Sequence, residues 1–378
     1  MKIAIFGGSF DPVHAEHVAV VRAAREKLGA DKIVVMPANI PPHKQGKNLA
    51  SGQDRLNMAK LAFAGIPGCE VSAYELNAGG TSYTCRTLAH FRQKYPDAQL
   101  YWLVGADMLK DFPTWREPEN ILSMAVLVAC SRAGEHVNFK AEQLRFFAKF
   151  RKGFRVLEFT GREISSTKAR VLAAFGEDLR PYLPEDVIAY IHANGLYRVE
   201  CVREALTFLK PARKKHTVSV ALTAAAAAAK CKTDEHSVIL AAGLHDSAKN
   251  MELSDPKLRG FCMEEHVPAP VLHQYTGAYL AEKYFGVTDE DVLNAVRYHT
   301  SGRPAMSVLE KLIFLSDMLE PGRQFPKVDK LRAYFAKDLN EGMFRALDHQ
   351  IRYLKKGKGE IYPLTFRAHE YYKNLRRN

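Results

Sequence analysis

The stretch KIAIFGGSFDPVHAEH, residues 2–17, decides the fold of the first half of this chain. A β-branched apolar run leads directly into two glycines, and a helix-forming segment begins a few residues later. A strand that turns through glycine into a helix is typical of parallel α/β sheets, in which the helix N-terminus suits a phosphate-bearing ligand. Residues 2–17 therefore predict an α/β domain that binds its ligand near the end of the first strand.

The residues that follow repeat this alternation of strand and helix. We expect five more strands, in KIVVMPA (32–38), CEVSAYE (69–75), AQLYWLVG (98–105), AVLVACS (125–131) and FRVLEF (154–159). Amphipathic helices are expected at about 15–29, 51–65, 83–95 and 141–151. PEDVIAYIHANGLY should close the domain as a helix, with Pro184 in its first turn and Gly195 as its C-terminal cap. The alternation predicts a parallel sheet of the dinucleotide-binding type over residues 1–197.

From residue 198 to residue 378 helix periodicity replaces the strand signals, and the alanine-rich run 224–229 favours a tightly packed helix. Imidazoles and carboxylates stand inside the apolar helical segments of this half: His216, His245, Asp246, His273, His299 and Asp317. Such side chains, pointed inward from several helices, are the ligands that a divalent metal needs. Six of them exceed one tetrahedral site, which predicts a two-metal centre of the kind that cleaves phosphate esters or anhydrides.

The composition is that of an ordinary globular protein of two or three domains, with 378 residues and a net charge of +12. Six scattered cysteines, with no C-x-x-C pair and no signal peptide, predict a reduced, cytoplasmic protein. No apolar run is long enough to span a membrane. We interpret the positive charge as attraction for anionic nucleotides and expect no nucleic-acid partner, because no RNA- or DNA-binding motif accompanies it. A homo-oligomer is compatible with the sequence.

Candidate phosphate-binding residues follow the first strand. Gly7 and Gly8 allow the backbone a tight turn close to a ligand. His14 and His17 are three residues apart, so they share one face at the start of a helix. Two imidazoles beside the positive end of a helix suit a polyphosphate.

A second candidate phosphate motif is ISSTKAR, residues 164–170. Its three hydroxyls stand at an expected helix N-terminus, where they can cap the helix and bind phosphate oxygens together with backbone N–H groups. Arg170 lies one turn further on and can add a bidentate contact. Alone, this segment would indicate an ordinary Ser/Thr helix cap. Together with the first motif it indicates a phosphate site.

The two motifs resemble those of the H-x-G-H nucleotidyltransferase superfamily, whose second signature is I-S-S-T-x-x-R. The resemblance narrows to nicotinate-nucleotide adenylyltransferases through PANIPPHK (37–44), GGTSYTCRTL (79–88), GADMLKDFPTW (105–115) and YLPEDVIAYIHANGLY (182–197). It implies a Rossmann-like domain in which nicotinate mononucleotide attacks the α-phosphorus of ATP, with Mg²⁺ and without a covalent intermediate. The implied catalytic residues are His14, His17 and Arg170. The implied ATP- and phosphate-binding residues are Gly7, Gly8, Ser9, Lys44, Ser165, Ser166 and Thr167, and the nicotinate nucleotide would meet Thr84, Asp107 and Trp115.

Two positions depart from the family's pattern. The usual Ile before Arg170 is Ala169, a modest change of volume. The glycine between the two histidines is Glu16, which adds bulk and negative charge near phosphates. Because consecutive helical positions point about 100° apart, we expect Glu16 to turn away from the site and adenylyl transfer to survive.

The pattern H…HD…H…H…D of the second half resembles HD-domain phosphohydrolases, and AVRYHTSGRPAMSVLEKLIFLSDMLEPGR narrows the resemblance to YqeK-type hydrolases, which split diadenosine tetraphosphate into two ADP. It implies an all-α HD domain over residues 198–378 with two divalent or ferric ions. Mixed nitrogen and oxygen ligands suit iron or manganese. The implied ligands are His216, His245, Asp246, His273, His299 and Asp317, with Asp246 bridging the ions. Lys249 would act with Asp246 in catalysis, and Lys249 and Arg303 would bind substrate phosphates.

Several alternatives stay open. The first half would suit a phosphopantetheine adenylyltransferase, although GGTSYT and GADML argue against this. The HD half would suit another nucleotide or phosphate ester; guanosine tetraphosphate is disfavoured, because no acidic pair follows the HD helix closely. A non-enzymatic alternative makes one half a nucleotide sensor or a basic RNA-binding module, on the basis of RYLKKGKGE and NLRRN. Two intact ligand sets count against it.

Overall fold

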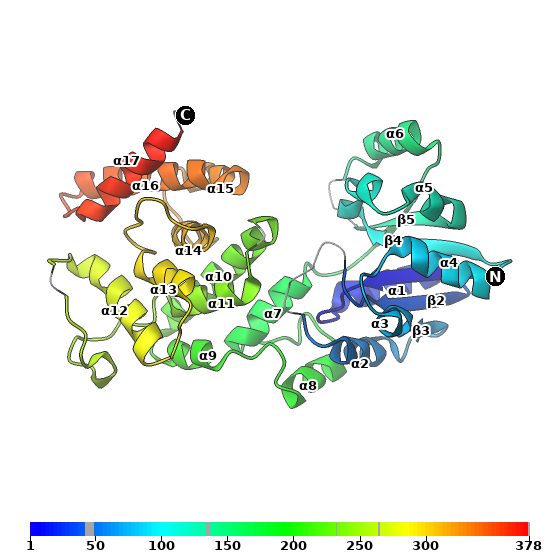
Figure 1. Ribbon diagram of the computed structural model, residues 1–378, viewed down its shortest axis with the longest axis horizontal. Helices are drawn as coiled ribbons and strands as arrows, with labels where there is room; N and C mark the ends of the chain where they lie inside the picture. Colours follow the sequence, from blue (N-terminus) through cyan, green and yellow to red (C-terminus); the bar gives the residue numbers. More distant parts are fainter. Residues whose placement is uncertain (42–48, 134–136, 232, 264, 377–378) are drawn as a thin grey trace. The chain divides into compact units, whose positions relative to one another are not determined.

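The computed structural model describes residues 1–41, 49–133, 137–231, 233–263 and 265–376 of the chain. They form two compact units (Figure 1). The first contains residues 1–169 and 179–196, and the second contains residues 170–178 and 197–378. Residues 170–178 thus group with the second unit, whereas the domain predicted from the sequence over residues 1–197 includes them.

The first unit is built on a six-stranded sheet in which every strand pair is parallel. Its spatial order is β3-β2-β1-β4-β5-β6. The strands are β1 (Lys2–Gly8), β2 (Lys32–Pro37), β3 (Cys69–Val71), β4 (Gln99–Gly105), β5 (Ala125–Arg132) and β6 (Arg155–Phe159). Strand order reverses direction between β1 and β4, and ligands of open α/β sheets bind at the carboxyl ends of strands at this point. The predicted phosphate loop follows β1 and therefore lies there.

Helices cover this sheet because its strands are apolar on both faces. On one face Leu88 of α4, Ile121 of α5 and Phe146 of α6 share a buried core with strand residues such as Ile5 and Trp102. Helix α1 contacts β2 and β6, and α2 contacts β2 and β3. The helices of this part of the chain are α1 (Ala15–Lys27), α2 (Gly52–Phe63), α3 (Tyr74–Ala78), α4 (Thr84–Lys94), α5 (Pro118–Met124), α6 (Phe139–Phe150), α7 (Ser166–Phe175) and α8 (Glu185–Ala193). Short 3₁₀ turns, η2 (Ala106–Leu109) and η3 (Phe112–Thr114), follow β4.

All six expected strands are present, with one correction. The third was expected over residues 69–75, but it ends at Val71, and the chain forms the short helix α3 from Tyr74. Gly195 has a φ of 61°, in the left-handed region expected of a residue that follows a helix end. Pro184 is the N-cap of α8, one position before the first turn.

Among its described residues the second unit contains helices and connecting turns and no strand. Its helices after α7 are α9 (Glu200–Thr207), α10 (Pro211–Cys231), α11 (Glu235–Leu244), α12 (Ala269–Lys283), α13 (Glu290–Arg297), α14 (Val308–Leu319), α15 (Val328–Lys337), α16 (Leu339–Lys356) and α17 (Pro363–Leu375), with a 3₁₀ turn η4 (Pro256–Leu258). Helix α10 packs against α11 and α14, and α13 packs against α12 and α14. Ala224, Ala225 and Ala228 are buried, so the alanine-rich run is a packed helix face.

The apolar core of the C-terminal helices joins α14 to α17. Leu315, Leu331, Leu347 and Tyr372 are among its buried members, and α15, α16 and α17 gather at this end of the unit (Figure 1). All six cysteines of the chain are free. Among the described residues, no helix combines the length and the apolar character needed to cross a membrane.

Candidate functional site

The loop after β1 is held by the core of the first unit. Arg55, which is buried, donates hydrogen bonds from its guanidinium to the carbonyl oxygens of Ser9 at 3.0 Å and Ala38 at 2.6 Å. A Cβ on Gly7 would lie 2.9 Å from the Trp102 ring, and a Cβ on Gly8 would lie 3.0 Å from the ring of Phe10. The two glycines therefore make room for aromatic side chains of the protein, a packing reason that the sequence analysis did not anticipate.

His14 and His17 come together at the start of α1, as their spacing predicts. Their rings are stacked, with centroids 3.6 Å apart, and His17 Nδ1 accepts a hydrogen bond from the backbone N–H of His14 at 3.1 Å. Burial lowers the pKa of His14 to about 3, so its ring is neutral. The His14 Nδ1 atom is buried and makes no hydrogen bond to any residue that the structure describes. A polar atom of this kind, beside a helix N-terminus, suits contact with an anionic ligand.

Glu16 is paired with an arginine. Its Oε1 accepts a hydrogen bond from a terminal nitrogen of Arg132 at 2.9 Å, and the two side chains are 19% and 27% exposed. Arg132 is the last residue of β5. The carboxylate that replaces the family's glycine therefore has a cationic partner, and this ion pair offsets the negative charge expected at that position.

The hydroxyls of the second motif anchor the start of α7. Ser165 Oγ accepts a hydrogen bond from the backbone N–H of Lys168 at 3.1 Å, as an N-cap does. Ser166 Oγ donates to the carbonyl oxygen of Pro12 at 3.0 Å, which ties this helix start to the loop that leads into α1. Thr167 follows in the first turn of α7.

Arg170 belongs to the second unit. Its guanidinium donates two hydrogen bonds, each 2.6 Å long, to the two carboxylate oxygens of Glu235, the first residue of α11. The predicted bidentate contact of this arginine is thus made to a carboxylate of the chain in this structure.

The residues predicted to meet the nicotinate nucleotide lie on or near α4 and the turns after β4. Thr84 begins α4 and is half-buried. Asp107, in η2, is exposed, and Trp115 packs partly against the core with its ring 5.3 Å from that of Phe112. Lys44 lies outside the described residues.

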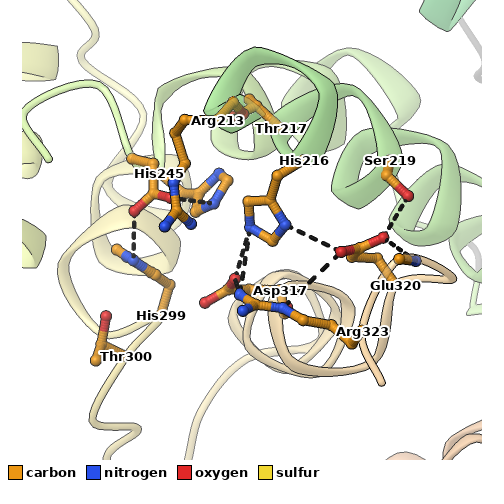
Figure 2. Close-up of polar contacts among 12 residues, drawn as sticks. Arg213, His216, Thr217, Ser219, His245, His299, Thr300, Asp317, Glu320 and Arg323 are labelled. Atoms are coloured by element: carbon orange, nitrogen blue, oxygen red, sulfur yellow. Dashed lines mark hydrogen bonds and ion pairs between the residues drawn. The ribbon is translucent and has the colours of Figure 1, made fainter. Parts of the chain in front are cut away.

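The second unit brings the six predicted metal ligands into two groups of three. His216, His245 and Asp317 form one group, and Asp246, His273 and His299 form the other; within each, one potential ligand atom per residue lies within 4.8 Å of the others. Helices α10, α12 and α14 supply His216, His273 and Asp317, and the ends of α11 and α13 lead into the remaining three. The histidine rings form edge contacts, with centroids 5.0 Å apart for His245 and His299 (Figure 2).

Asp246 lies between the two groups. Its Oδ2 is 3.4 Å from His245 Nε2, and its Oδ1 is 3.4 Å from His273 Nε2 and 3.7 Å from His299 Nε2. Burial opposes ionisation of this carboxyl, but the nearby charges of His245 and His299 outweigh burial and hold the pKa of Asp246 below its usual range. An ionised carboxylate with one oxygen toward each group is suited to bridge two metal ions.

The histidines turn ring nitrogens toward these groups. His245 Nδ1 donates to the carbonyl oxygen of Ala242 and His299 Nδ1 donates to that of Val296, both at 2.7 Å, so Nε2 is the nitrogen of each ring that faces Asp246. His245 Nε2 is fully buried and makes no hydrogen bond to the described residues. Burial, with the nearby His299 and Lys249, lowers the pKa of His273 to about 2, so this ring is neutral. A buried nitrogen with no hydrogen bond and the neutral imidazole of His273, beside ionised carboxylates, fit a metal centre.

Cationic side chains border the centre. Arg213 donates a 2.9 Å hydrogen bond to Asp246 Oδ2, and Arg323 donates a 2.7 Å hydrogen bond to Asp317 Oδ1 (Figure 2). Lys249 Nζ lies 3.9 Å from Asp246 Oδ1, and burial lowers the pKa of this lysine. Arg303 instead donates to both carboxylate oxygens of the fully buried Glu310, so its predicted role in binding phosphate stays a prediction.

The sequence analysis missed Arg213, Arg323 and the buried carboxylate Glu320. Arg213 precedes His216 by three positions, and Glu320 follows Asp317 by three, so each shares a helix face with a predicted ligand. Reading the i±3 neighbours of the ligands would have found both. Arg323 follows α14, where its guanidinium turns back toward Asp317, and no periodicity indicates that.

Comparisons with known protein families match the two halves of the chain to two different families. The cytidylyltransferase-like family matches residues 5–172, and the HD domain matches residues 213–322. A Mycoplasma genitalium protein named "Probable nicotinate-nucleotide adenylyltransferase/Ap4A hydrolase" is 28% identical over 326 residues, 85% of this chain and 88% of the relative. A Desulfitobacterium hafniense protein named "Probable nicotinate-nucleotide adenylyltransferase" is 36% identical over 199 residues, 52% of this chain and 96% of the relative.

A solved structure of an HD superfamily hydrolase from Clostridium acetobutylicum, described as involved in NAD metabolism, is 31% identical to this chain. The match covers 47% of this chain and 97% of that one, with a TM-score of 0.42.

Proposed function

This chain belongs, over 52% of its length, to the nicotinate-nucleotide adenylyltransferase family and carries an HD domain in its second half, and from this premise we propose that it is a bifunctional enzyme. One activity transfers the adenylyl group of ATP to nicotinate mononucleotide, giving nicotinate adenine dinucleotide and pyrophosphate. The other hydrolyses diadenosine tetraphosphate at its central anhydride, adding one water and giving two ADP. The Mycoplasma relative, whose name joins both activities, supports this pairing.

Adenylyl transfer rests on the neutral His14 at the N-terminus of α1. A neutral imidazole that donates one hydrogen bond, beside the backbone N–H groups of a helix start, can hold ATP phosphates without itself adding charge. His17 supports its ring by stacking, and Ser166 fixes the start of α7 against the loop before α1. These groups position the 5′-phosphate of nicotinate mononucleotide and the α-phosphorus of ATP for direct attack, and catalysis is positioning plus charge stabilisation. Mg²⁺ would accompany ATP.

Hydrolysis rests on the Asp246 carboxylate between two ligand groups. His216, His245 and Asp317 would hold one ion, His273 and His299 the other, and Asp246 would contact both. Iron or manganese bound there would supply Lewis-acid stabilisation of phosphate oxygens. Arg213, Arg323 and Lys249, which contact the carboxylates of Asp246 and Asp317, would neutralise the phosphates of the substrate.

The hydrolase is tested by incubating the purified, metal-loaded chain with diadenosine tetraphosphate and identifying the products by chromatography. ADP alone supports the proposal. ATP with AMP would show asymmetric cleavage, and absence of turnover with ions bound would assign the HD centre to another substrate. Pyrophosphate release that requires both ATP and nicotinate mononucleotide tests the transferase in the same preparation.

A further inference from the structure

Glu320 is a buried carboxylate beside the proposed metal centre but outside both ligand groups. It is 4% exposed, and both of its oxygens have partners: Oε1 accepts from His216 Nδ1 at 3.1 Å and lies 3.9 Å from Arg323 Nε, and Oε2 accepts from Ser219 Oγ at 2.6 Å and from the backbone N–H of Gly322. Figure 2 shows the His216 ring between Glu320 on one side and Asp317 on the other. The contact with Asp317 is made through His216 Nε2, at 2.9 Å.

Two of the other three predicted ligand histidines, His245 and His299, have their Nδ1 bonded to a backbone carbonyl, whereas His273 Nδ1 lies 3.2 Å from Lys249 Nζ. His245 follows α11, and His299 stands two residues after α13, so the carbonyls of Ala242 and Val296 lie in last helical turns. The last four carbonyls of a helix have no intrahelical N–H partner and can accept a histidine proton.

His216 has no such carbonyl within reach of its position. It is the sixth residue of the 21-residue helix α10, where carbonyls accept from the N–H groups of the next turn. The carbonyl of Arg213, three residues earlier, also accepts the Thr217 hydroxyl at 2.9 Å. At this position in α10 the acceptor for His216 Nδ1 is a side chain, the carboxylate of Glu320.

We propose that Glu320 is the positioning residue of His216: it holds the proton on Nδ1 and keeps the Nε2 lone pair directed into the group with His245 and Asp317. The inference rests on the proposed metal centre and deepens it. A carboxylate behind a ligating histidine fixes the tautomer and raises the basicity of the ligand nitrogen, and loss of such a partner typically weakens metal binding about 10–100-fold.

The test measures metal affinity in the full chain. Glu320→Ala is expected to weaken binding of one of the two ions, with Mn²⁺ as the probe in competition with a chelator, by about 10–100-fold and to leave the other unchanged. Glu320→Gln, whose amide oxygen can still accept the Nδ1 proton, should recover part of this affinity. Glu310→Ala is the matched control: it also removes a buried carboxylate of this unit, but Glu310 contacts Arg303 and the start of α14, so two ions should bind with affinity within about twofold of the native chain.

A second measurement locates the His216 proton directly. Long-range ¹H–¹⁵N spectra of the Zn²⁺-loaded chain should show His216 protonated at Nδ1 and unprotonated at Nε2, and Glu320→Ala should lose this pattern. Native-like affinity of Glu320→Ala for both ions, or an unprotonated His216 Nδ1 in the Zn²⁺-loaded native chain, would overturn the proposal. The function is judged separately, because a chain that binds two ions and leaves diadenosine tetraphosphate intact refutes the hydrolase and not the role of Glu320. A native chain that binds no ion refutes both.

Discussion

Glu16 replaces a glycine of the family's motif, and its substitution tests whether the first site carries an unbalanced negative charge. We expect Glu16→Gly to lower the free energy of unfolding by about 2 kcal/mol and to change kcat/KM for adenylyl transfer by less than about tenfold. The reason is the Arg132 ion pair, which already offsets the carboxylate charge.

The stability loss has three sources. A partly exposed ion pair of this kind contributes about 0.2–1 kcal/mol. Glu16 also lies in the first turn of α1, where a negative charge gains about 0.3–1 kcal/mol from the helix dipole. Glycine in place of glutamate lowers helix propensity by up to about 1 kcal/mol, and less so near a helix end. Glu16→Gln keeps the propensity and should lose about half as much.

The assay is steady-state pyrophosphate release with varied ATP, alongside urea unfolding of each variant. Arg132→Gln removes this cationic partner of the Glu16 carboxylate and should lower kcat/KM for ATP about tenfold, equivalent to about 1.4 kcal/mol. Adding Glu16→Gln should restore it, whereas an arginine that binds substrate directly would leave the double variant impaired. A rise of a hundredfold or more in Glu16→Gly would refute the reasoning, because it would show that the paired carboxylate still opposes the nucleotide.

Three further predictions concern residues of the two sites. Replacing His245 and Asp246 together by alanine should abolish hydrolysis and metal loading and leave adenylyl transfer intact; a normal metal content by mass spectrometry would contradict the assignment of the centre. Because burial lowers the pKa of His14 from 6.5 to about 3, its neutral ring contributes stability above pH 6.5 that is lost as the pH falls toward 3. Between pH 7.5 and pH 5 the native chain should therefore lose about 2 kcal/mol more than His14→Gln in urea unfolding, and equal losses would count against a buried neutral ring. Arg213→Met and Arg323→Met should each raise KM for diadenosine tetraphosphate about tenfold with two ions still bound, and loss of an ion instead would mean that these arginines serve the ligand carboxylates.

Periodicity and spacing predicted the features that local chemistry determines. The six strands follow from β-branched apolar runs, and the grouping of the metal ligands follows from the HD pair and its helical neighbours. The stacking of His14 on His17 follows from their spacing of three at a helix start.

Features that depend on the partner of a side chain were beyond prediction from the sequence. Gly7 is required by Trp102, which lies on a neighbouring strand 95 positions later. Arg132 compensates Glu16 across 116 positions, and only the order of the strands brings β6 and the last residue of β5 beside α1. The third strand was expected to be too long because CEVSAYE alternates as a strand does, whereas its last two residues begin α3.

The interleaved course of the chain has a consequence for dissecting the enzyme. The backbone passes between the two compact units three times, at residues 169–170, 178–179 and 196–197, so no single cut releases both units intact. Truncation after residue 196 would remove Arg203, whose guanidinium donates to the carbonyl oxygens of Ala173 and Ala174 at the end of α7, and would also remove the carboxylate that holds Arg170. A transferase expressed as the first 196 residues would carry a frayed helix at its second phosphate motif. Its measured kcat and KM would therefore include the effect of the truncation.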